Sequence, residues 1–220
     1  MQAEGSVATA GAEIRPKLRG VLHAFAAVLA IAGMVLLLLV ADKPTGYIGG
    51  AVFATSLICL YGISASYHQI PWRPDWRRIV KRLDHAMIFV FIAGTYTPFC
   101  LDVSVAWGIP MLAVVWSLAG AGAIMKVLWP DAPRWLGVGL YIGLGWIGAV
   151  AATEVFDQYL GGPLALLLAG GALYTIGGVI YALQRPNPWP RIFGYHEIFH
   201  SFVVAGSAFH YTAIALYVVQ

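Results

Sequence analysis

Two histidines near the C-terminal end of the chain, His196 and His200, are separated by four positions. On a helix this spacing places both imidazoles on one face, one turn apart, as two ligands of a single metal ion require. The pair begins a long apolar segment, in which ionisable side chains are costly and usually functional. The spacing therefore predicts a metal site near the end of a helix.

Other polar side chains stand at the ends of neighbouring apolar segments. His68 ends one segment, with Ser64 one helical turn before it, and Asp84 begins the next segment. Three imidazoles and a water form a catalytic zinc arrangement, in which the metal lowers the pKa of the water toward about 7. We predict that Zn²⁺ is bound by His68, His196 and His200. The alternative is that these histidines bind no metal and are only solvated or structural.

Asp84 and Ser64 complete the predicted site. Asp84 is expected to hold or deprotonate the water, or to be a fourth ligand. Ser64, on the same helix face as His68, is expected to donate a supporting hydrogen bond or to polarise a substrate carbonyl.

The composition identifies an integral membrane protein. Of its 220 residues, 60% are hydrophobic and 10% are charged, whereas about 25% are charged in a typical soluble domain. We predict an all-α bundle of seven transmembrane helices and expect membrane lipid, not nucleic acid, as the partner. Residues 1–14 are expected to be a disordered tail, and residues 15–220 a single seven-helix domain. The predicted spans are 20–41, 47–67, 83–100, 105–128, 135–152, 159–183 and 196–219.

The basic residues predict an orientation for these spans. With seven spans, all Lys and Arg except Lys43 fall on the side of the N-terminus, which the positive-inside rule assigns to the cytoplasm. The C-terminus is then extracytoplasmic. The residues on the cytoplasmic side are Arg15, Lys17, Arg19, Arg73, Arg77, Arg78, Lys81, Arg82, Lys126, Arg134, Arg185 and Arg191. The same alternation brings the predicted zinc ligands and Asp84 to one depth near the cytoplasmic face.

The remaining histidines of the spans receive different interpretations. His85 lies about 100° around a helix from Asp84, so we interpret it as structural. His210 is about 21 Å along its helix from His196, too far to share a metal, and is interpreted as an interhelical hydrogen-bond donor. His23 is either a hydrogen-bonding helix-packing residue or a further member of the site.

A competing interpretation comes from Glu197. Residues 196–200 match the H-E-x-x-H pattern, in which the glutamate is the general base of a metalloprotease. Asp84 would then be a third ligand of an intramembrane protease. Alternatively, Glu197 is a carboxylate at a helix N-terminus, where the helix dipole favours negative charge.

The assembled motifs resemble the hemolysin III family of bacterial membrane proteins, which is similar to the adiponectin and progesterone receptor (PAQR) family. Residues 64–68 (SASYH) resemble the family's S-x-x-x-H, and residues 196–200 its H-x-x-x-H. The third-span signature is matched by 83–88 (LDHAMI) and 93–98 (AGTYTP). One stretch departs: of the polar residues that often enter the family's first span, only a histidine, His23, is retained.

The resemblance implies a multi-pass protein of the bacterial plasma membrane, with zinc near the cytoplasmic face held at the positions of His68, His196 and His200. It places Asp84 beside the metal-bound water. The wider superfamily includes alkaline ceramidases, so the resemblance implies a zinc-dependent hydrolase of a membrane lipid amide or ester. The alternative is a non-enzymatic membrane sensor or a cytolysin with a structural zinc. Because the family pattern leaves the residues between the last two histidines open, the resemblance weakens the protease interpretation.

Overall fold

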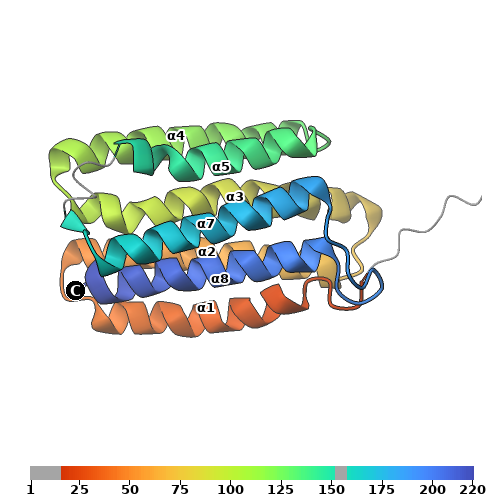
Figure 1. Cartoon of the computed structure of the whole chain (residues 1–220), viewed down its shortest axis with the longest axis horizontal. Coiled ribbons are helices and arrows are strands. Elements are labelled where there is room, and N and C mark those ends of the chain that lie inside the picture. The colour runs from red at the N-terminus through yellow and green to blue at the C-terminus, as the bar shows by residue number, and fades with distance from the viewer. Residues whose placement is uncertain (1–15, 152–157) are drawn as a thin grey trace, which may run out of the picture.

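The computed structural model describes residues 16–151 and 158–220, and the predicted tail 1–14 lies outside them. The described chain is helical, and its long helices run side by side (Figure 1). They are α1 (Val21–Val40), α2 (Pro44–Gln69), α3 (Pro74–Asp102), α4 (Val105–Leu128), α5 (Arg134–Ala151), α7 (Gly162–Leu183) and α8 (Tyr195–Tyr217). All of these except α5 are long and apolar enough to cross a membrane. The chain is therefore a multi-pass membrane protein.

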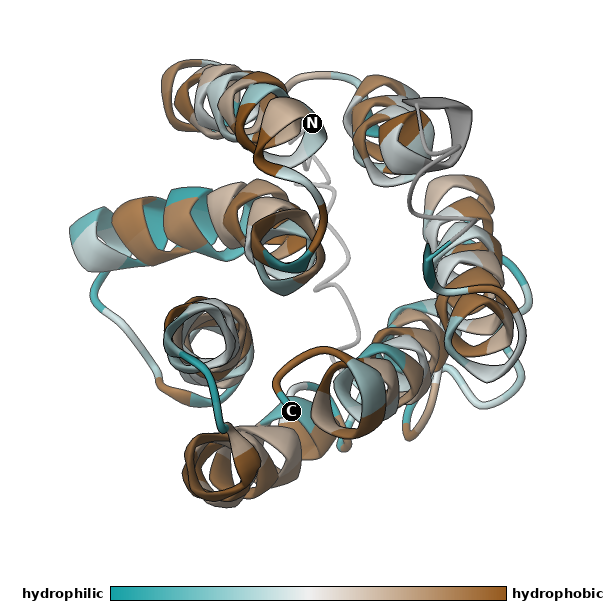
Figure 2. Ribbon diagram, turned by 90° about the vertical axis from the view of Figure 1, so that its left-hand side faces the viewer, coloured by the Kyte–Doolittle hydropathy of each residue, from teal (hydrophilic) through white to brown (hydrophobic). Residues whose placement is uncertain are grey.

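Viewed along the bundle, the helices form a ring (Figure 2). Each helix packs against its neighbours in chain order, and α1 closes the ring by contacting α8. α2 is held tightly between α1 and α3, whereas α5 makes the loosest contacts with its neighbours α4 and α7. The outer surface carries many exposed apolar side chains, such as Leu29, Leu39 and Val105. This outward apolar surface is the arrangement that a lipid environment stabilises.

The predicted spans are close to the observed helices, with one informative difference. The fourth predicted span coincides with α4, but α3 begins at Pro74 rather than near Leu83. Proline at the first helical position and Asp75 in the first turn both favour a helix start there. The basic residues expected in a loop, Arg77 to Arg82, are thus helical, because hydropathy marks the apolar stretch and not the helix end.

The buried core lies between the ring members and is tightest around α2. Phe53 of α2 is fully buried and contacts the rings of Phe91 and Tyr211 from α3 and α8. A second cluster, around Phe89 of α3, joins α4 and α5. At Gly122 of α4 a Cβ atom would lie 2.4 Å from the Phe89 ring, so glycine permits this close approach. These two clusters hold α3 in place on both sides.

Candidate metal centre

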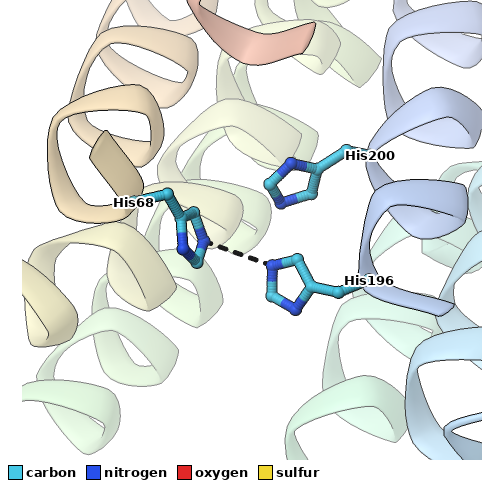
Figure 3. Close-up of side chains that lie close together, drawn as sticks. All are labelled: His68, His196 and His200. Carbon is cyan, nitrogen blue, oxygen red and sulfur yellow. Dashed lines mark hydrogen bonds between the residues drawn. The ribbon is translucent and has the colours of Figure 1, made fainter. Parts of the chain in front are cut away.

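The three predicted ligands meet at one end of the bundle. His68 comes from the last turn of α2, and His196 and His200 from the first two turns of α8. Their ligand nitrogens all lie within 4.8 Å of one another. Figure 3 shows the three rings converging, although 128 positions separate His68 from His196. We call these residues the three-histidine cluster.

The geometry of this cluster fits a tetrahedral zinc site. The Nε2 atoms of His68 and His196 are 3.2 Å apart, within hydrogen-bonding distance. Two imidazole nitrogens on one tetrahedral Zn²⁺, each about 2.0–2.1 Å from the ion, would be about 3.3 Å apart. His68 and His200 are 7% and 3% exposed, so the donor set is sheltered from bulk water. With all three nitrogens within 4.8 Å of one another, the imidazoles form a possible Zn²⁺ donor set.

Asp84 lies beside the cluster, as predicted. Its Oδ2 atom is 3.9 Å from His68 Nε2, the nitrogen that faces His196. Ser64, which is 2% exposed, is the side-chain hydrogen-bonding neighbour of the Asp84 carboxylate. The structure therefore brings the three predicted ligands, the aspartate and the serine to one place.

The Glu197 carboxylate is engaged by partners outside the three-histidine cluster. Its Oε1 accepts a hydrogen bond from Arg19 Nε in a partly buried ion pair, and its Oε2 accepts from the Gly194 backbone N–H at 2.7 Å. Glu197 thus caps the start of α8 and fastens the segment before α1 to it. Since both oxygens are engaged, this arrangement argues against a general base at Glu197 and supports the helix-terminus interpretation.

The other histidines have distinct surroundings. His210 Nε2 donates to the Leu167 carbonyl at 3.1 Å, which confirms the predicted interhelical hydrogen bond. His85 Nδ1 lies 2.7 Å from the Lys81 carbonyl, a structural contact, but its ring also lines the same cavity as Asp84. The 100° offset did not predict that both residues line one cavity.

A cavity of about 150 Å³ lies inside the bundle, and His196 and His200 of the cluster line it. His200 and His210 both line it, and at 1.5 Å per residue they are about 15 Å apart along α8. Its wall is mainly apolar, with Leu60, Ile88, Phe91, Ile92 and Val203. A mainly apolar space beside a polar cluster suits an alkyl chain with a polar head.

Gly20 and Tyr181, which have no role in the sequence analysis, pack against the three-histidine cluster. Gly20, before α1, has φ +82°, and a Cβ there would lie 2.6 Å from the His68 Cβ. Tyr181 of α7 presents its ring to His196 at a centroid distance of 5.5 Å. No local pattern marks these residues, because their partners are more than ten positions away in sequence. His23, left open above, stacks on His200.

Comparison with known proteins shows which sequences this chain is similar to. The family described as haemolysin-III related matches residues 12–211. The chain is similar to the hemolysin-3 homolog of Bacillus subtilis (strain 168), with 31% identity over 202 residues, covering 90% of this chain and 92% of the relative. Hemolysin-3 of Bacillus cereus is 32% identical over 200 residues, covering 89% and 88%. The adiponectin receptor protein of Drosophila melanogaster is 30% identical over 185 residues, covering 76% of this chain and 41% of the relative.

Proposed function

This chain belongs to the haemolysin-III related family, and we propose that it is a Zn²⁺-dependent hydrolase of a membrane lipid amide or ester. The observation that carries the proposal is the three-histidine cluster, with Asp84 3.9 Å from His68, beside a mainly apolar cavity. Imidazoles, a carboxylate and a space for an alkyl chain are the parts that hydrolysis of a lipid acyl bond requires.

Each residue of the site has a separate proposed role. His68, His196 and His200 would hold the metal, and when bound, Zn²⁺ supplies a water activated for attack near neutral pH. Asp84 is placed to accept a proton from the attacking water and to pass it to the leaving nitrogen or oxygen. Ser64 orients the Asp84 carboxylate. In the net reaction the acyl C–N or C–O bond breaks, water oxygen enters the carboxylic acid, and the amine or alcohol takes the proton.

The substrate would enter with its alkyl chain in the cavity and its acyl bond at the cluster. The wall formed by Ile88, Phe91 and Ile92 of α3 offers no charge to an alkyl chain. We place this end of the bundle at the cytoplasmic face of a bacterial plasma membrane, because the basic residues of the loops and helix ends gather there.

The test combines metal analysis with turnover. We expect one zinc per detergent-purified chain, and a loss of zinc in the His196→Ala/His200→Ala double variant. Asp84→Asn should keep its zinc and fold but lose hydrolysis of long-chain amides and esters by about 10²-fold or more. Absence of zinc from well-folded wild-type protein would refute the proposal.

A non-enzymatic sensor or cytolysin with a structural zinc is the second candidate. The proximity of Asp84 to the cluster favours it, since three imidazoles and a carboxylate can also close a four-coordinate structural site. The two candidates separate on Asp84→Asn: a structural site would lose zinc affinity, and the wild type would show no turnover in a screen of lipid amides and esters.

A further inference from the structure

His23, in the first turn of α1, lies against the three-histidine cluster without belonging to it. Its ring is 3% exposed and stacks on the His200 ring, with centroids 3.7 Å apart and planes 7° from parallel. Its other ring neighbour is Tyr61 of α2, at 4.9 Å. His23 also lines the same cavity as Ser64 and Asp84. The first helix therefore contributes a side chain to the wall of the site.

Both ring nitrogens of His23 are buried and have no hydrogen-bond partner among the described residues. A buried polar atom without a partner is unfavourable, and those that occur in native proteins call for a specific explanation. Packing alone would be served better by an apolar ring at this position. Because His23 lines the cavity, its two unpaired nitrogens indicate a partner that arrives from that cavity.

His23 is not placed to be a fourth ligand of a metal that His200 binds. An imidazole nitrogen directs its lone pair in the plane of the ring, and the ion lies about 2.0–2.1 Å from it. The two planes are nearly parallel with centroids 3.7 Å apart, so a metal in the plane of His200 lies outside the plane of His23. The partner of His23 must therefore be something beside the metal position.

Several of the other polar groups at this end of the cavity are already engaged. Ser64 neighbours the Asp84 carboxylate, His85 Nδ1 contacts the Lys81 carbonyl, and the Tyr141 hydroxyl donates to the His85 carbonyl at 3.0 Å. A carbonyl oxygen that enters here needs an N–H or O–H donor. A neutral imidazole has one N–H, and His23 offers it without giving up another bond.

We propose that His23 is a substrate-contacting catalytic residue, whose ring N–H donates a hydrogen bond to the carbonyl oxygen of the acyl bond under attack. This inference rests on the proposed hydrolase function. The hydrogen bond strengthens as negative charge develops on that oxygen, and it acts in a site sheltered from water. Removal of one such donor typically lowers kcat by about 10²- to 10³-fold.

Three variants separate hydrogen bonding from stacking. His23→Phe keeps an aromatic ring against His200 and removes both nitrogens, His23→Ala removes ring and nitrogens, and His23→Gln restores an N–H donor. Each is assayed for zinc per chain, thermal stability, kcat and KM on a long-chain acyl amide, and the Kd of dodecylphosphonate. The phosphonate is a tetrahedral anion on an alkyl chain, so it imitates the charge and shape that His23 would contact.

We expect His23→Phe to keep its zinc, its stability and its KM, while kcat falls about 10²-fold and phosphonate binding weakens at least tenfold. His23→Gln should recover part of both losses. A His23→Phe variant with wild-type kcat and Kd would overturn the inference, and so would one that loses its zinc, because the ring would then serve to position His200.

The phosphonate measurement distinguishes this inference from the proposed function. If zinc-loaded wild type binds the phosphonate but hydrolyses no amide or ester, the hydrolase proposal fails, and the Kd of His23→Phe still decides whether His23 contacts the ligand. If zinc-loaded wild type neither binds the phosphonate nor hydrolyses lipid, both are refuted.

Discussion

Arg19 and Glu197, 178 positions apart in the chain, form an ion pair that joins the segment before α1 to the first turn of α8. Glu197 stands between two residues of the three-histidine cluster and is 3% exposed. The backbone bonds from Lys17 N–H to the Arg191 carbonyl and from Leu18 N–H to the Ile192 carbonyl tie the same segments together. The segment before α1 is thereby fastened to the start of α8 and to the residues that precede it.

Substitution of Arg19 should destabilise the protein without touching a ligand. Arg19→Ala leaves the buried Glu197 carboxylate without its cation. Because Arg19 is itself 20% exposed, we expect a cost of about 1–3 kcal/mol. We expect a clear fall in the apparent Tm of the detergent-solubilised protein, and a smaller further fall when Glu197→Gln is added. Additive losses from the two changes would show that the pair is not coupled.

Glu197→Gln alone tests the role of the carboxylate. Because its oxygens bind Arg19 and the Gly194 N–H, we expect this variant to keep its zinc and its hydrolytic turnover while losing some stability. Zinc content and kcat on a long-chain amide are the measurements. A folded, zinc-loaded Glu197→Gln protein without turnover would restore the metalloprotease type of mechanism.

Gly20→Ala should weaken metal binding through backbone geometry. Gly20 has φ +82°, which disfavours a side chain, and the added Cβ would lie 2.6 Å from the Cβ of His68. Displacement of His68 is expected to lower zinc affinity about 10-fold or more, as measured by competition with a chelator. Gly120→Ala is the matched control, since a Cβ at Gly120 meets nothing within 4 Å. Equal affinities for both variants would contradict the prediction.

Removal of zinc should lower the thermal stability of the wild-type protein, and this effect should require His68. A ligand that binds only the folded state at 100 times its Kd stabilises it by about 2.7 kcal/mol. Treatment with a chelator should therefore lower the Tm, and added Zn²⁺ should restore it. His68→Ala should show neither change, because the cluster cannot form. A zinc-dependent Tm in His68→Ala would place the metal elsewhere.

Blocking the cavity should make the activity depend on chain length. Ile92 lines the cavity, so Ile92→Trp fills the space proposed for the alkyl chain. We expect turnover of a long-chain ester to fall at least tenfold more than that of a short-chain ester, because each excluded CH₂ forfeits about 0.8 kcal/mol of burial. Ile176→Trp on α7, where Ile176 is 47% exposed, is the control. Equal losses on both esters would argue against an alkyl chain in this cavity.

Much of this protein was determined by local sequence. Runs of apolar residues require helices in a membrane, because backbone groups there must bond within their own segment. The i, i+4 spacing of His196 and His200 placed them on one face of α8, and the same rule placed Ser64 beside His68 on α2. Because the ends of α2, α3 and α8 were predicted to lie at the same membrane depth, His68 and Asp84 were expected at the depth of His196 and His200.

Only the tertiary structure decided which of the polar side chains at this membrane depth contact one another. Helix rotation and packing bring His68 Nε2 to 3.2 Å from His196, turn Glu197 toward Arg19, and stack His23 on His200. Each contact joins residues more than a hundred positions apart, and it depends on close approaches such as Gly20 against His68. Periodicity specifies the face and depth of a side chain on its own helix. Its partner across the bundle is set by the packing of the whole ring of helices.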